Sequence, residues 1–339
     1  MKVLITGGSG FIGTNLINYL FELGGFEIVN IDLQTYASTQ ENFDGHDGNY
    51  SIEKYDICNK NKISEIIGDY KPEKVLHLAA ESHVDRSIEN PDSFIHTNIL
   101  GTYNLLNCSY DYYKNLENSA KKIFRFHHVS TDEVYGSLGP VGLFTEKSPY
   151  KPNSPYSASK ASSDHLVRAW YETYSFPTII SNCSNNFGPF QNPEKFIPKT
   201  ILSLLKGKNI TIYGDGLQIR DWLHVKDHSK AISAIFRKGE VGETYNIGAN
   251  NERSNLEIVQ IIHCKLKSLG LIEDDEDFSE RIEFVEDRLG HDVRYAIDNQ
   301  KITKNLGWKP DEHFEDAIYD VIKWYSDNDA WCNKVLEAQ

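Results

Sequence analysis

The sequence lacks long apolar runs and closely spaced cysteines. No apolar stretch approaches the roughly 18 residues that suggest a membrane-spanning helix, so we expect no membrane partner. The five cysteines, none of them in a C-x-x-C pair, are Cys58, Cys108, Cys183, Cys264 and Cys332. Their odd number and wide spacing argue against a disulfide framework and a zinc site. We therefore predict reduced thiols and no metal.

Basic residues are also scarce. The chain has 35 Lys and Arg against 49 Asp and Glu, which gives a formal net charge of -14. This charge repels nucleic-acid phosphates at long range, although it permits a local cationic pocket for a diphosphate. The acidic run at 273–277 is more typical of a solvated loop than of a metal site. Because of its net negative charge, we expect the protein to bind no nucleic acid. Because the first residues lack the regions of a signal peptide, we expect it to be cytoplasmic.

In the first half of the chain, short β-branched runs alternate with amphipathic helical stretches. This alternation is typical of parallel βαβ units and predicts an α/β fold with a doubly wound, Rossmann-type parallel sheet. The predicted strands are Val3–Thr6, Glu27–Asp32, Tyr50–Lys54, Lys74–Leu78, Ile123–Ser130 and Thr178–Ser184. The predicted helices are Phe11–Leu23, Lys60–Tyr70, Phe94–Tyr113 and Tyr156–Tyr174.

A glycine-rich segment follows the first predicted strand and begins the first predicted helix. Gly8, Gly10 and Gly13 fit the G-x-G-x-x-G fingerprint in the context it requires. These glycines permit a tight turn, a close approach of the backbone to a pyrophosphate, and close packing of helix on strand. Asp32 ends the next strand, where its carboxylate can accept hydrogen bonds from a ribose 2′-hydroxyl and would repel a 2′-phosphate. The sequence therefore predicts NAD rather than NADP.

The second half of the chain differs from the first in composition. After about Asn185, Pro, Gly and Asn are frequent and the elements are short, as expected for binding loops. The segment Trp222–Ile247 is typical of a strand, a helix and a second strand. We predict an NAD-binding domain at 1–184, to which 223–247 returns, and a smaller mixed α/β substrate-binding domain at 185–222 and 248–339.

Tyr156 and Lys160 lie one helical turn apart on the same face of a predicted helix. The spacing alone is weak, because four other Tyr/Lys pairs in the chain share it. Context distinguishes this pair, since Pro155 precedes it and the strand before it ends in Ser130 and Thr131. A nearby ammonium favours the phenolate, which predicts that Tyr156 is a base near neutral pH. Thr131 can bond to the same substrate hydroxyl.

Together these motifs resemble the extended short-chain dehydrogenase/reductase family, and within it the nucleotide-sugar 4,6-dehydratases. The likeness extends over nearly the whole chain, and its ordered matches are specific. It includes the segments 81–87, 130–136, 184–189, 193–195, 219–222 and 287–291. Two departures are Leu289, where the family usually has Pro, and His224, where it commonly has an aromatic residue. Neither removes a chemical group that the reaction needs.

The resemblance implies a dehydration carried out by Thr131, Asp132, Glu133, Tyr156 and Lys160. Tyr156 takes the O4 proton of a hexose while C4 gives a hydride to NAD, and the hydride later returns to C6. Glu133 is the base for the C5 proton and Asp132 is the acid for the C6 oxygen, so Asp132 must stay protonated while Glu133 is ionised. The product would be a 4-keto-6-deoxyhexose for deoxysugar biosynthesis of the rhamnose type.

The resemblance also implies which residues bind the two ligands. The cofactor set is Gly7, Gly10, Phe11, Ile12, Gly13, Asp32, Leu33, Gln34, Thr35, Asp56, Ile57, Leu78, Ala79, Ala80, Ser82, Thr97, Tyr156, Lys160 and Asn186. The substrate set is Ser82, Thr131, Asn185, Lys195, Phe196, Thr211, Ile212, Tyr213, Arg220, Asn255, Asp287, Arg288 and His291. The substrate is a nucleoside-diphosphate hexose, and the cations of the second set suit its diphosphate. A homodimer is also implied, through helices near Phe94–Tyr113 and Tyr156–Tyr174.

Three alternatives remain open from the sequence. The resemblance implies dTDP-glucose, but UDP-glucose differs by one methyl, which is worth only about 1 kcal/mol in a pocket. A UDP-sugar epimerase or decarboxylase would keep Tyr156 and Lys160 but has no evident need for Asp132 and Glu133. A non-catalytic NAD sensor could keep the glycines while losing the tyrosine and lysine.

Overall fold

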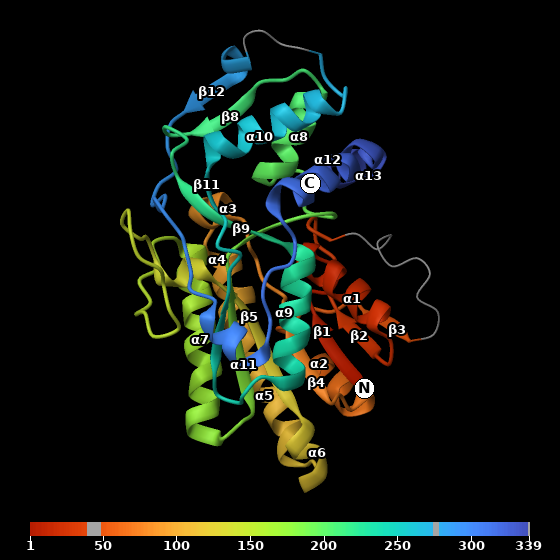
Figure 1. Cartoon of the computed structure of the whole chain (residues 1–339). Helices are drawn as coiled ribbons and strands as arrows, with labels where there is room; N and C mark the ends of the chain where they lie inside the picture. Colours follow the sequence, from red (N-terminus) through yellow and green to blue (C-terminus); the bar gives the residue numbers. More distant parts are fainter. Residues whose placement is uncertain (39–48, 274–277, 338–339) are drawn as a thin grey trace.

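The centre of the molecule is a parallel sheet of seven strands (Figure 1). The computed structural model describes residues 1–38, 49–273 and 278–337. The strands, in spatial order, are β10 (Thr244–Ile247), β6 (Thr178–Cys183), β5 (Arg125–Thr131), β4 (Lys74–His77), β1 (Lys2–Thr6), β2 (Glu27–Ile31) and β3 (Tyr50–Glu53). Every neighbouring pair is parallel. The predicted doubly wound α/β class is confirmed.

Helices cover both faces of this sheet. On one face, Leu16 of α1 (Phe11–Leu23) and Phe236 of α9 (Val225–Lys238) share a core with the strands. On the other face, α2 (Lys60–Tyr70), α5 (Thr102–Lys114) and α7 (Pro155–Tyr174) bury Ile63, Leu105 and Val167. Strands that are buried on both faces read as continuous apolar runs, which is why their positions could be predicted.

Three sequence predictions about these elements were wrong in detail. The strand expected from Ile123 starts at Arg125, because Asn118–Ile123 forms the short helix α6. The helix expected from Phe94 consists of α4 (Asp92–Phe94), a π-helical segment η2 (Ile95–Gly101) and α5. The strand at Trp222 belongs to a second sheet, so only β10 and α9 of that segment pack in the main sheet layer.

Most of the second half of the chain lies across one end of the main sheet, at the top of Figure 1, whereas α9, β10 and α11 (Gln300–Leu306) pack in or beside the main sheet. It has a three-stranded sheet of β11 (Glu252–Ser254), β9 (Ile219–His224) and β7 (Asn185–Phe187), and a pair β12 (Ile282–Val285) and β8 (Ile210–Tyr213). Its helices are α8 (Phe196–Leu205), α10 (Asn255–Ser268), η4 (Phe278–Arg281), α11 (Gln300–Leu306), α12 (Phe314–Asp327) and α13 (Asp329–Glu337). Ile201, Ile258 and Ile318 join α8, α10 and α12 in one core.

The remaining sequence expectations concern the acidic run, membrane-spanning helices and the domain boundaries. The acidic run at 273–277 lies, except for Glu273, outside the described residues. Among the residues that the structure describes, no helix is long and apolar enough to cross a membrane. The division of the chain into domains at 184 and 248 stays a prediction.

Candidate active site

A cavity of about 730 Å³ lies at the carboxyl ends of the parallel strands, where ligands bind in open α/β sheets. It is lined from the main sheet by the loops after β1, β2, β4, β5 and β6, and from the second half by residues such as Arg220 and Asn255. All five expected catalytic residues line it. So do all of the expected cofactor residues except Gln34, and all of the expected substrate residues except Ile212 and Asp287.

In the turn between β1 and α1, close packing explains some of the glycines, and the adjoining cavity explains another. A Cβ on Gly7, whose φ is +74°, would lie 2.5 Å from the backbone nitrogen of Ala79. A Cβ on Gly13 would lie 2.4 Å from the carbonyl oxygen of Gly7. A Cβ on Gly10 meets only that same oxygen, at 3.5 Å, so packing does not require glycine there. Gly10 lines the cavity and is the N-cap of α1, and it provides no side chain to accept hydrogen bonds from the first amides of the helix. These amides can therefore donate to a pyrophosphate in the cavity.

Asp32 lies at the end of β2 and is tied to the same turn. Its Oδ2 accepts a hydrogen bond of 2.9 Å from the amide of Ser9, and its Oδ1 accepts one of 2.7 Å from the amide of Gln34. Burial raises the pKa of Asp32, while these two amides oppose the shift. Gln34, with a φ of 55°, forms the turn after Asp32 and does not line the cavity, and its contact with the cofactor stays a prediction.

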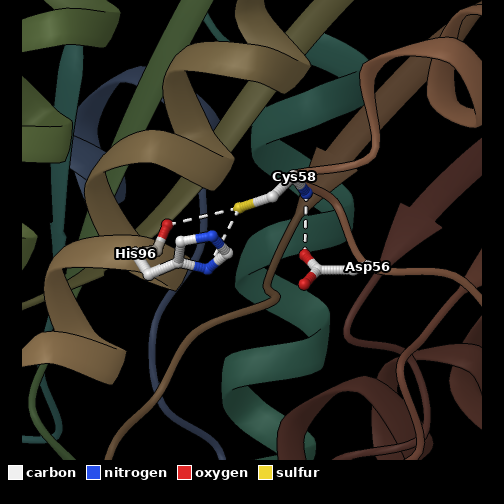
Figure 2. A group of neighbouring side chains, drawn as sticks. All are labelled: Asp56, Cys58 and His96. Atoms are coloured by element: carbon white, nitrogen blue, oxygen red, sulfur yellow. Dashed lines mark hydrogen bonds between the residues drawn. The ribbon is translucent and has the colours of Figure 1, made fainter.

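A group of possible metal ligands lies where β3 ends (Figure 2). One ligand atom each from Asp56, Cys58 and His96 lies within 4.8 Å of the others. The Cys58 sulfur is 3.5 Å from Nδ1 of His96, and the Asp56 carboxylate accepts a hydrogen bond from the Cys58 amide. Burial, and then Asp56, raise the pKa of the Cys58 thiol to about 12. Because the thiolate is the metal ligand, this protonated thiol does not favour a metal site.

Helix α7 positions the tyrosine and lysine. Ser154 and Ser157 form a capping box, and Pro155 occupies the first helical position, so the helix begins directly before Tyr156. Tyr156 and Lys160 are both buried and both line the cavity. The Lys160 ammonium donates a hydrogen bond of 2.9 Å to the carbonyl oxygen of Val129 in β5.

The pKa of Tyr156 depends on burial as well as on its charged neighbours. Burial, followed by the charge of Glu133, raises the pKa of Tyr156 well above its ordinary value, while a hydrogen bond with Thr131 lowers it. Burial thus opposes the effect predicted for Lys160, and the acidifying role of its ammonium stays a prediction. The physical reason is that desolvation of the phenolate outweighs the help of its neighbours, and the Lys160 ammonium is bonded to Val129.

The two adjacent carboxyls occupy different environments. They begin the 3-10 turn η3 (Asp132–Tyr135), in which the Thr131 hydroxyl accepts a hydrogen bond from the amide of Glu133. Asp132 is 1% exposed, and burial, with Glu133 and then Asp221, raises its pKa well above its ordinary value. This environment favours the protonated form of Asp132.

Glu133 has cations within reach that Asp132 largely lacks. Burial raises the pKa of Glu133 as well, but Arg220, Arg288 and Lys195 all lower it. For Asp132, Arg220 is the only cation among the principal causes. The cations thus favour ionisation of Glu133 over that of its neighbour. This is the division of labour that a paired acid and base require.

Two arginines line the part of the cavity nearest the second half. Arg220 is buried, donates a hydrogen bond of 2.9 Å to the carbonyl oxygen of Asp292, and stacks 4.4 Å over the ring of Tyr295. Arg288 forms a two-point ion pair with Asp85 of α3 (Val84–Glu89), at 2.5 and 3.0 Å. A guanidinium that pairs with a carboxylate at two points can pair in the same way with a phosphate.

Two of the expected substrate residues do not line the cavity. In β8 the side chains alternate, so Thr211 and Tyr213 line the cavity while Ile212 is buried in the core behind them. Asp287 does not line the cavity. Its carboxylate instead holds the following turn, 2.6 Å from Nδ1 of His291, and accepts a hydrogen bond from the amide of Arg288.

Other cavity residues were not singled out from the sequence. They include Tyr36, Asp85, Glu194, Trp222, Asp292 and Tyr295. Asp85 and Glu194 lie inside matched segments, which was the only signal for them. The ion pair of Asp85 joins residues 203 positions apart, and no local pattern encodes such a partner.

Comparisons with known proteins agree with this geometry. A family model described as GDP-mannose 4,6 dehydratase matches residues 4–321. The chain is 49% identical to a dTDP-glucose 4,6-dehydratase of Neisseria meningitidis, covering 99% of this chain and 96% of that protein. A dTDP-glucose 4,6-dehydratase of Bacillus anthracis, solved with NAD, is 40% identical with a TM-score of 0.86 and covers 99% of both chains. One from Streptomyces venezuelae, also solved with NAD, is 38% identical with a TM-score of 0.89 and covers 99% of this chain and 100% of that one.

Proposed function

This chain belongs to the GDP-mannose 4,6 dehydratase family, and from this premise we propose how its residues act. The chain is an NAD-dependent hydro-lyase that converts dTDP-glucose to dTDP-4-keto-6-deoxyglucose and water. The observation that carries the proposed roles is the pair Asp132 and Glu133, adjacent in sequence but held in opposite charge environments. Both line the same cavity as Tyr156.

In the proposed mechanism, Tyr156 accepts the proton of the sugar O4 hydroxyl, and Thr131 holds the same oxygen. Bound NAD takes the hydride from C4 and later returns it to C6. The resulting 4-ketone acidifies C5, whose proton passes to Glu133, while Asp132 protonates the C6 oxygen that leaves as water. Glu133 then returns a proton to C5. Tyr156 releases the proton it gained and Asp132 regains the one it lost through exchange with solvent, so protons and hydride balance and no external reductant is consumed.

The diphosphate of the substrate is proposed to bind the cationic side of the cavity. Arg220, Arg288 and Lys195 all line that side. Arg288 is paired with Asp85, so an incoming phosphate would take over the contacts that this carboxylate makes. The same three cations favour the ionised form of Glu133, which links substrate binding to the state of the base.

A mass measurement tests the proposed function. Purified protein is incubated separately with dTDP-glucose and with UDP-glucose, and the nucleotide sugars are then weighed by mass spectrometry. We expect dTDP-glucose to yield a product lighter by one water. Loss of water only from UDP-glucose would reassign the nucleotide, and unchanged mass with inverted C4 would indicate an epimerase. No reaction with either sugar would remove the dehydratase assignment.

We also propose a homodimer. On η2 and α5, the large apolar side chains Ile95, Leu100 and Tyr103 are 46 to 51% exposed, and Tyr174 at the end of α7 is 47% exposed. Tyr103 packs edge-on against Trp170 of α7, at 5.9 Å between ring centroids, so the two helices present one apolar face. A contiguous apolar face is typical of a protein interface. The cytoplasmic location and the rhamnose-type pathway stay predictions.

A charge on this face should separate the two subunits. We expect Leu100→Glu to shift the protein from dimer to monomer in sedimentation, because burial of an unpaired carboxylate opposes association. Leu23→Glu is the matched control, since Leu23 is 45% exposed at the end of α1, on the opposite layer. A wild-type chain that sediments as a monomer, or a Leu100→Glu dimer as stable as the control, would remove this face as the interface.

A further inference from the structure

A third charged residue continues the row of Tyr156 and Lys160 on helix α7. Asp164 follows Lys160 by four positions, as Lys160 follows Tyr156, so the three lie along one face of the helix. Asp164 is 2% exposed and does not line the cavity. It therefore cannot touch the substrate, and the mechanism above gives it no role.

The carboxyl group of Asp164 is held by two hydrogen bonds and faces a histidine. Its Oδ2 accepts hydrogen bonds of 2.9 Å from the hydroxyls of Ser130 and Tyr150. Its Oδ1 lies 3.2 Å from Nε2 of His128. Hydrogen bonds donated to a carboxylate favour its charged form. Burial raises the pKa of Asp164 to about 6, and Lys160 is the foremost group that lowers it. Asp164 is thus mostly ionised at neutral pH.

Lys160 needs a negative partner of this kind. It is 4% exposed, and burial lowers its pKa, whereas Asp164 is the foremost group that raises it. A buried ammonium without a counterion loses its hydration and tends to lose its proton. Without that proton, Lys160 brings no positive charge to the helix face that it shares with Tyr156.

Other titratable groups around this pair do not replace Asp164. They are His77 of β4, His128 of β5, Cys183 of β6, Tyr150 of the loop before α7, and His165 of α7 itself. Burial holds the pKa values of His77 and His128 well below their ordinary range, so both are neutral. Burial raises the pKa of the Cys183 thiol to about 12 and also raises that of Tyr150, so neither is an anion at neutral pH.

We propose that Asp164 is a positioning residue for the first proton transfer: its buried carboxylate, held by Ser130 and Tyr150, keeps Lys160 an ammonium on the helix face that it shares with Tyr156. The proposal rests on the proposed role of Tyr156 as the base. Asp164 acts through Lys160 and not on the substrate. Its removal should therefore change the proton affinity of Tyr156 much more than the binding of the sugar nucleotide.

The test is a titration of the tyrosine in Asp164→Asn, a change that keeps size and hydrogen-bonding groups but removes the charge. The ultraviolet absorbance of phenolate is followed against pH in the NAD-loaded protein, with and without Tyr156→Phe, so that the difference reports Tyr156 alone. We expect about tenfold less Tyr156 phenolate at a given pH in Asp164→Asn, which is a rise of one pKa unit. We expect kcat to fall about tenfold near neutral pH and to recover at higher pH, with KM little changed.

Asp227→Asn is the matched control. Asp227 is equally buried, at 1% exposed, but on α9 it bonds to Lys230 and to the amides of Asp311 and Glu312. Its loss should lower the melting temperature and leave the Tyr156 titration unchanged. Tyr150→Phe, which removes one donor to Asp164, should move the titration in the same direction by a smaller step, and it replaces Asp164→Asn should that variant not fold.

The outcomes separate this proposal from the proposed function. A Tyr156 midpoint that is unchanged or lower in Asp164→Asn overturns the role of Asp164, since a carboxylate acting directly on the phenolate would lower that midpoint when removed. Absence of dehydrated product from the wild-type protein overturns the function instead. The phenolate titration does not depend on turnover, so it tests the role of Asp164 whether or not the wild-type protein forms dehydrated product.

Discussion

Replacing Glu133 with Gln is expected to lower product formation by on the order of 10²- to 10⁴-fold and to leave reduced NAD on the enzyme. Gln cannot accept the C5 proton, so the reaction stops after the hydride has left C4. The charge of Glu133 raises the pKa of Tyr156, so its loss should also move the titration of Tyr156 to lower pH. Rapid mixing with dTDP-glucose, followed by the absorbance of reduced nicotinamide, measures the accumulation.

The matched control for Glu133 is Glu146→Gln. Glu146 is partly exposed, and its carboxylate accepts a hydrogen bond from the amide of Asn246, away from the cavity. Gln can still accept that bond, so turnover should stay close to wild type. Undiminished turnover of Glu133→Gln, or a slow variant without reduced NAD, would take Glu133 out of the proton abstraction at C5.

Tyr156→Phe is expected to slow turnover by a similar factor, on the order of 10²- to 10⁴-fold, but at an earlier step. Phe cannot accept the O4 proton, so C4 is not oxidised and no reduced NAD forms. The pKa of Tyr156, raised by burial and by Glu133, also predicts the pH dependence. The phenolate fraction increases as the pH rises toward that pKa, so the rate of the first hydride transfer in the wild type should rise with pH above neutrality.

The double variant Tyr156→Phe with Glu133→Gln orders the two steps. If Tyr156 acts first, the double variant should accumulate no reduced NAD, in contrast to Glu133→Gln alone. Tyr135→Phe is the control, because Tyr135 is 2% exposed and its hydroxyl donates a hydrogen bond of 2.8 Å to Asn246 outside the cavity. Reduced NAD in the double variant at the level of the single one would show that Tyr156 is not the base for C4 oxidation.

Most of the main sheet could be predicted because its strands and helices are local patterns. Buried parallel strands are short apolar runs, and the helix at Tyr156 carries its own start signals in Ser154 and Pro155. The errors fell where local pattern and tertiary packing differ. In η2, a Cβ on Gly101 would lie 2.5 Å from the Ile57 side chain, a close approach of helix and loop that no periodicity reports.

In the candidate site, too, some features could be predicted from local sequence and others could not. The identity and spacing of Gly13, Asp32, Tyr156 and Lys160 were enough to predict a dinucleotide and a base, because backbone turns and helix faces are local. Protonation states were not predictable, because they depend on desolvation and on distant charges. Tyr156 was expected to be made acidic by Lys160, but burial dominates in the folded chain.

By itself, the sequence determined the fold class, the cofactor turn and the adjacency of Asp132 and Glu133. Only the tertiary structure shows how the environments of these two carboxyls differ, because burial isolates Asp132 while cations from distant segments face Glu133. The charge behind Lys160 was likewise hidden, since Asp164 acquires its partners Ser130 and Tyr150 only when strand, loop and helix pack together. Electrostatic energies depend on distance in space and on exclusion of water, and folding sets both.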